Sequence, residues 1–130
     1  MEIRDKDNVL LAIVIKGDSI NQGKNFLTPN EDDFQLAAFN LETGDKIIRH
    51  YHPEQKRNIT KTSEAIVIIE GEIDVTIYDK DLDIVNEIKL FKGDTVALIS
   101  GGHEMNIKKD SKFVEVKQGP YDPDTDKVRF

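Results

Sequence analysis

Residues 64–90, EAIVIIEGEIDVTIYDKDLDIVNEIKL, contain the clearest fold signal in the chain. Within this stretch, residues 73–78 and 85–90 form two runs in which apolar side chains alternate with polar ones. The segment 79–83, DKDLD, separates the two runs and is acidic overall. Two such runs joined by a short polar turn are typical of a β-hairpin. The stretch therefore predicts antiparallel β-structure.

Further runs of strand length lie on both sides of this hairpin, and no segment shows the long apolar stripe of an amphipathic helix. They cover residues 9–15, 34–40, 46–52, 64–70, 95–99, 105–107 and 113–117. Gly, Asn, Asp and Pro residues separate the runs, as is typical of tight turns. The pattern predicts a single all-β domain over residues 1–130, an antiparallel sandwich or barrel, with an irregular C-terminal tail at 119–130.

Composition narrows the classes of function. The net charge of −7 opposes binding to a phosphate backbone, so nucleic acid is not expected as a partner. The chain has no cysteine, so any bound metal must use histidine and carboxylate ligands. It also lacks an apolar run of roughly 18 residues and a signal peptide, and we expect a cytoplasmic protein without membrane contact.

The three histidines and one glutamate form a candidate metal site. His50 and His52 lie two residues apart in the expected strand 46–52, so both imidazoles project from the same face. Glu64 shares a face with Ile66 and Ile68, where a carboxylate needs a partner. Gly101 and Gly102 allow a tight turn just before His103. These features predict that the three imidazoles and the carboxylate converge on one ion.

At these positions the chain resembles the cupin superfamily. Residues 44–52, GDKIIRHYH, and residues 64–71, EAIVIIEG, match the two rigid parts of the first cupin motif. Residues 93–106, GDTVALISGGHEMN, are similar to the second motif, with Ile99 in the place of its proline and two spacings shorter by one. The interval at 53–63 is several residues longer than in the usual pattern, and its composition suits either a lid or a plain surface loop.

The resemblance covers residues 44–106 and implies a jelly-roll barrel, also called a double-stranded β-helix. It implies one divalent metal ion, either Fe, Mn, Ni or Zn, held by His50, His52, Glu64 and His103. Glu54 is an alternative to Glu64 as the carboxylate ligand. It further implies a homodimer, for which the run 9–15 offers an edge strand.

Two functions remain open. The first is a small-molecule metalloenzyme of dioxygenase or isomerase type, acting on a small substrate for which an anionic or sugar-derived compound is one option. In that case Lys56 and Arg57 could hold an anionic group, although a solvated loop is the preferred interpretation of these two residues. The alternative is a non-catalytic, metal-stabilised module that binds a ligand or a sugar.

Overall fold

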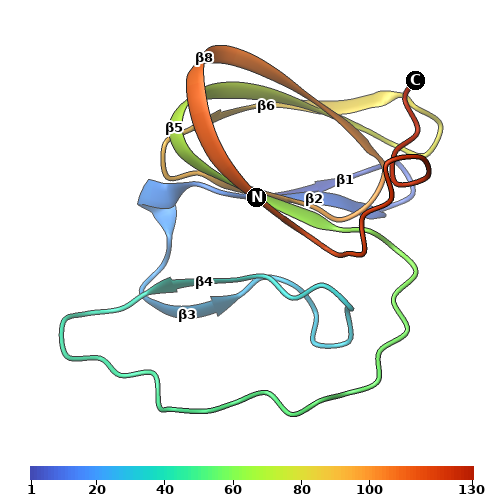
Figure 1. Cartoon of the computed structure of the whole chain (residues 1–130). Helices are drawn as coiled ribbons and strands as arrows, with labels where there is room; N and C mark the ends of the chain where they lie inside the picture. The colour runs from blue at the N-terminus through green and yellow to red at the C-terminus, as the bar shows by residue number, and fades with distance from the viewer.

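Eight strands and one short 3-10 helix make up the regular structure of the chain, seen in a computed structural model that describes all 130 residues (Figure 1). The elements are β1 (Glu2–Arg4), β2 (Leu10–Ile15), η1 (Gly17–Ser19), β3 (Gly23–Phe26), β4 (Ala37–Asn40), β5 (Glu64–Tyr78), β6 (Ile84–Phe91), β7 (Thr95–Leu98) and β8 (Gly102–Lys117). The predicted all-β class is confirmed. The structure contains no helix with the length and apolar composition needed to cross a membrane.

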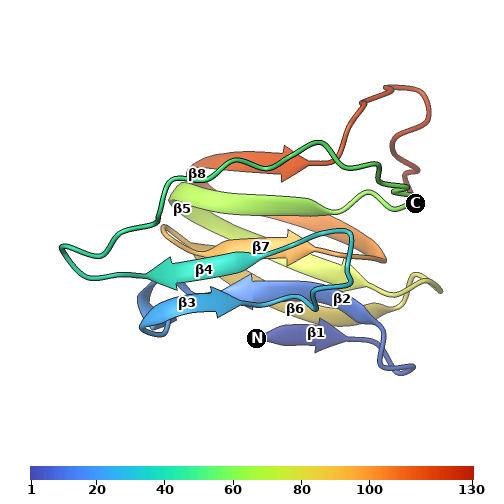
Figure 2. The same ribbon diagram turned by 90° about the horizontal axis from the view of Figure 1, so that it is seen from below.

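Six strands form one antiparallel sheet in the order β1-β2-β7-β5-β6, and β8 pairs with β5 (Figure 2). The first part of β5 pairs with β7 and with the end of β8, whereas its second part pairs with β6 and with the beginning of β8. Register shifts between Ile68 and Ile73 accompany the bend of this long ribbon, and Gly71 lies there with a φ of 99°. The second edge of β8 has no partner strand.

The core lies against this sheet and is made mostly by alternate residues of its strands. Thirteen buried apolar residues form it, namely Ile3, Leu11, Ala12, Val14, Ile66, Ile68, Ile73, Val75, Ile77, Ile88, Leu90, Val96 and Leu98. Met105 of β8 is half-buried and packs against this cluster. None of these residues comes from positions 16–62, so that part of the chain adds nothing to the core.

The predicted hairpin at 73–90 is confirmed as β5 and β6. Its turn is held by Asp79, whose Oδ1 accepts hydrogen bonds from the backbone N–H groups of Asp81 and Asp83. Two features differ from the prediction. The runs 64–70 and 73–78 are one continuous strand, and 105–107 and 113–117 are likewise parts of β8. The short strands β1 and β3 were not predicted.

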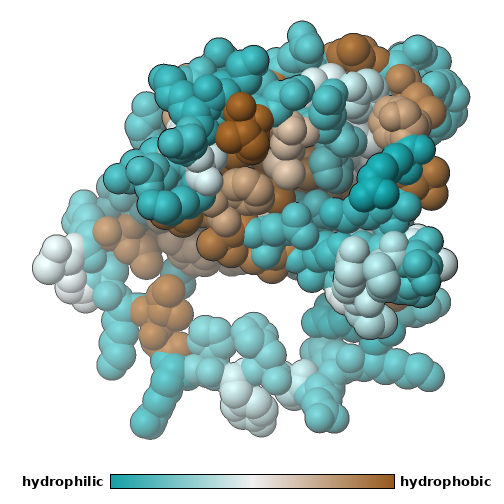
Figure 3. Space-filling model, turned by 45° about the horizontal axis from the view of Figure 1, so that its top comes forward, coloured by the Kyte–Doolittle hydropathy of each residue, from teal (hydrophilic) through white to brown (hydrophobic).

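The middle of the chain stands apart from the main sheet. β3 and β4 pair only with each other, and residues 41–63 then form a long arc without any strand (Figure 1). Side chains do not close the opening between this arc and the body (Figure 3). The predicted strand at 46–52 is therefore wrong for this conformation, because no neighbouring edge pairs with it. The expected edge at 9–15 is also wrong, since β2 lies between β1 and β7.

Candidate functional site

A cavity of about 660 Å³ lies at the end of the sheet where β5 and β8 begin. Its walls come from the turn that precedes β8, from the first residues of β5 and β8, and from the C-terminal tail. The polar side chains that line it include Glu64, Tyr78, His103, Glu104, Lys127 and Arg129. Two of the predicted metal ligands, Glu64 and His103, are thus found in one cavity.

Backbone pairing brings these two ligands together. Glu64 is the first residue of β5 and pairs with Leu98 at the end of β7. Gly101, with a φ of 74°, then turns the chain into β8, and a Cβ at this position would lie only 2.2 Å from the backbone oxygen of Tyr78. His103 follows, and its Nε2 lies 3.7 Å from Oε2 of Glu64. The predicted turn at Gly101 and Gly102 is present, and His103 after it meets Glu64 but neither His50 nor His52.

Glu64 is buried, with 7% of its surface exposed, and its Oε2 has no hydrogen-bond partner. The distance of 3.7 Å to His103 is too long for a hydrogen bond. Buried carboxylate oxygens are normally paired, because removing them from water without a partner costs several kcal/mol. This oxygen is therefore available to bind a cation or to accept a hydrogen bond from a ligand.

The surroundings of His103 favour the uncharged form of its imidazole. Burial lowers the pKa of His103 below its ordinary value, and the charge of Lys127 lowers it further, although Glu64 acts in the opposite direction. A neutral imidazole keeps a ring nitrogen free to bind a cation or to accept a hydrogen bond. A neutral imidazole beside an unpaired carboxylate is a donor pair that suits a divalent cation.

His50 and His52 do not reach this cavity. Both are exposed on the arc 41–63, where their rings pack edge to face with centroids 5.2 Å apart. Nδ1 of His50 lies 2.8 Å from the backbone oxygen of Ile48. Glu54, the alternative carboxylate, is exposed on the same arc. In this conformation no group of three or more His, Asp or Glu side chains is placed to hold a metal ion.

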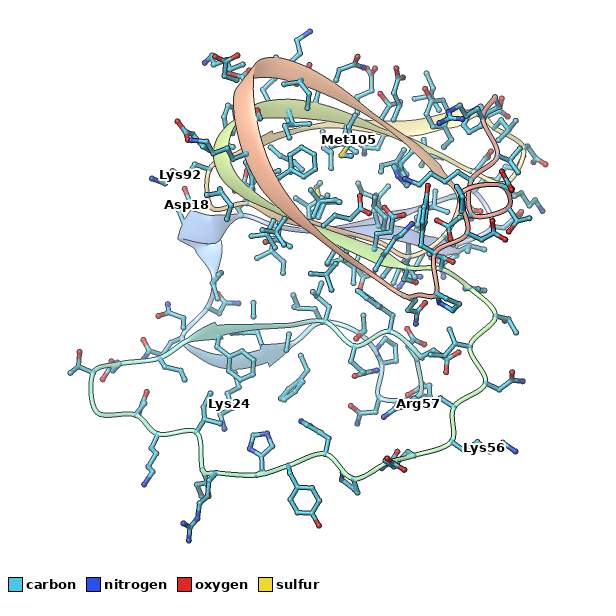
Figure 4. All side chains as sticks on the ribbon, in the orientation of Figure 1. Asp18, Lys24, Lys56, Arg57, Lys92 and Met105 are labelled. Carbon is cyan, nitrogen blue, oxygen red and sulfur yellow. The ribbon has the colours of Figure 1, made fainter.

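The cationic residues near the cavity differ from those expected. Lys56 and Arg57 are exposed on the arc, apart from the strand that carries Met105 (Figure 4). Lys127 and Arg129 of the tail line the cavity instead. Sequence reasoning missed them because residues 119–130 lack strand signals, and irregular segments do not reveal which surface they cover.

Several contacts attach the C-terminal tail to the sheet. Lys117 and Asp126 form an ion pair that is largely buried. The ring of Phe130 packs edge to face on Tyr78, with centroids 5.1 Å apart, and lies close to Gly102. The phenol of Tyr78 donates a hydrogen bond of 3.2 Å to Glu104. The tail therefore forms one wall of the cavity beside His103.

Comparisons of the chain with protein-family models, with curated proteins and with solved structures found no significant match. The case for a function thus depends on the motif residues and on the geometry of this cavity.

Proposed function

We propose that the chain is a cupin-like, metal-binding protein whose cavity at Glu64 and His103 is its ligand site. The observation that carries this proposal is the buried Oε2 of Glu64, which has no partner and lies 3.7 Å from His103. A cation at this position would give the carboxylate a counter-charge and would use the free nitrogen of the imidazole. The cavity of about 660 Å³ has room for a small molecule beside it.

The proposed ion is a single divalent Fe, Mn, Ni or Zn, and its proposed ligands remain His50, His52, Glu64 and His103. Only Glu64 and His103 meet in this conformation, so the full set of four does not fit here. For that reason we propose no reaction step through the metal. The chemistry proposed for a completed site is oxygenation or isomerisation of a small substrate, within a jelly-roll barrel.

The lining of the cavity also favours a second candidate, a non-catalytic module that binds an anionic ligand or a sugar acid. Lys127 and Arg129 give one wall positive charge, and His103 and Glu104 offer hydrogen-bonding groups on another. Such a ligand could bind without any metal. Two measurements separate the two candidate functions. Activity after metal loading would favour the enzyme, and ligand binding by the metal-free protein without activity would favour the binding module.

The variant Glu64→Gln tests the metal proposal directly. It keeps the shape of the side chain and removes its charge, so the affinity for Mn²⁺ or Zn²⁺ should fall at least about 100-fold. The metal-free variant should be no less stable than the original chain, because an unpaired buried carboxylate is replaced by a neutral amide. Titration calorimetry measures the affinity, and urea denaturation measures the stability.

Glu70→Gln is the matched control, because Glu70 also lies on β5 but is exposed and pairs with Lys112. This variant should bind metal as the original chain does. Elemental analysis of the purified proteins should show about one metal per chain and a loss in Glu64→Gln and in His103→Ala. Equal metal affinity in Glu64→Gln and the original chain would refute the proposal.

A further inference from the structure

Glu64 and Lys117 are neighbours at the place where β5 begins and β8 ends. They lie directly opposite each other in the antiparallel pairing, and residues paired in this way project from the same face of a sheet. The backbone beside them is fixed, because Gln118 N–H donates to the oxygen of Ser63 and Ser63 N–H donates to Oε1 of Gln118. The fold therefore places an ammonium group within reach of the buried carboxylate of Glu64.

The ammonium of Lys117 nevertheless binds elsewhere. It forms an ion pair with the largely buried Asp126, and it lies 4.6 Å from the centre of the ring of Tyr121. Both partners belong to the C-terminal tail, which turns back from the end of β8 (Figure 1). No ion pair joins Lys117 to Glu64, and Oε2 of Glu64 has no hydrogen-bond partner. The tail thus takes up an ammonium that would otherwise be available to Glu64.

Two buried carboxylates act on this one ammonium. The hydrogen bond from Lys117 to Asp126 is the main cause that raises the pKa of Lys117, and the charge of Glu64 raises it further. Glu115 also acts on Lys117, but its side chain is exposed and hydrated. A largely buried ammonium needs a counter-charge, and the flexible four-carbon stem of lysine allows a change of partner. Without the charge of Asp126, Glu64 would be the preferred partner, because its carboxylate is buried and unpaired.

We propose that Asp126 is a positioning residue for the cavity, which keeps the carboxylate of Glu64 free for a cation by holding Lys117. Loss of this ion pair lets Lys117 turn to Glu64 and take the place of the cation. The tail then controls whether the cavity can bind, because it carries both Asp126 and Tyr121. The inference rests on the proposed function where the cation is a metal ion, whereas the change of partner by Lys117 requires no metal.

Stability without metal tests the change of partner, using the full chain in the presence of EDTA. In the original chain, Glu64→Gln should leave the urea midpoint unchanged or raise it, because Oε2 of Glu64 has no partner to lose. In an Asp126→Asn background, the same change should lower the midpoint by about 0.5 M or more, because it removes the new partner of Lys117. Asp126→Asn should still fold, since the tail contributes no residue to the core.

Glu115→Gln is the matched control, because Glu115 also acts on Lys117 but is exposed. It should shift the midpoint equally in the original chain and in the Asp126→Asn background. If Glu64→Gln also shifts the midpoint equally in both, Lys117 does not turn to Glu64 and the proposal is overturned. A loss with Glu115→Gln that occurs only in the Asp126→Asn background overturns it as well, because Lys117 would then have turned outward.

Metal affinity, measured by titration calorimetry, tests the consequence for the site. Asp126→Asn should weaken Mn²⁺ binding at least about 10-fold, because fewer molecules keep the carboxylate of Glu64 free. Lys117→Gln/Asp126→Asn should regain the affinity of the original chain, since it has no ammonium to occupy the site. Asp126→Glu keeps the charge and should also bind Mn²⁺ as the original chain does.

The positioning role and the metal site can fail separately. If the original chain binds no Mn²⁺ but Glu64→Gln lowers the midpoint only in the Asp126→Asn background, the metal site is refuted and the change of partner stands. Equal Mn²⁺ affinity in the original chain and in Asp126→Asn overturns the positioning role and leaves the metal site standing. If Lys117→Gln/Asp126→Asn binds as weakly as Asp126→Asn, release of the tail rather than the ammonium weakens binding, and the positioning role is again overturned.

Discussion

Replacement of Gly71 by alanine is expected to lower the free energy of unfolding by about 4 kcal/mol, which is a large effect for one methyl group. Gly71 has a φ of 99°, a left-handed conformation that strains any residue with a Cβ. An added Cβ would also lie 2.7 Å from Cα of Ser111 and would clash with the backbone of Asp110. β5 and β8 would have to separate at their bend. Urea denaturation followed by circular dichroism measures this loss.

Gly44→Ala is the control for the effect of backbone conformation alone. Gly44 has a φ of 101°, yet nothing lies within 4 Å of the position that its Cβ would take. This variant should lose only about 1 kcal/mol. If both variants lose the same amount, the close approach of β8 to Gly71 does not contribute to stability.

The second large effect is expected at Asp94, where an alanine should cost about 3 kcal/mol. Asp94 is buried and accepts hydrogen bonds from Lys16 at 2.6 Å, from Phe91 N–H at 3.0 Å and from Gly17 N–H at 3.1 Å. The alanine leaves these donors without their acceptor. Asp18→Ala, an exposed change nearby, should cost less than about 0.5 kcal/mol.

The contribution of Asp94 should depend on pH. Burial raises the pKa of Asp94, but the hydrogen bonds from Lys16, Phe91 and Gly17 outweigh it and hold the pKa below its ordinary value of 3.8. A lowered folded-state pKa gives stability that is present above the unfolded-state pKa and is lost as the pH falls through the folded-state pKa. The difference in stability between the original chain and Asp94→Ala should therefore shrink below about pH 4. A difference that stays constant between pH 7 and pH 3 would contradict this assignment.

The interval at 53–63 separates the paired histidines from Glu64 by a long stretch without a strand. The first cupin motif places its glutamate soon after the paired histidines, whereas eleven residues separate His52 from Glu64 in this chain. A tether of this length allows residues 46–52 to lie apart from the main sheet.

Local sequence determined the all-β class, the hairpin of β5 and β6, and the turn that brings His103 to Glu64. Alternation and turn chemistry act over a few residues, so they can be recognised without knowledge of partners. Glu64 was correctly placed on the buried face with Ile66 and Ile68, because side chains of a strand alternate strictly between its two faces.

Only the tertiary structure decided which strand-like segments pair with another strand. Residues 46–52 have the pattern of a strand yet lie unpaired, because a strand exists only when another edge accepts its hydrogen bonds. The tail residues Lys127 and Arg129 line the cavity beside the ion pair of Lys117 with Asp126, a contact that links the last residue of β8 to a segment without strand signals. Sequence alone thus determined which segments have the local pattern of a strand. Long-range pairing decided which of these segments form the sheet and which side chains meet at the site.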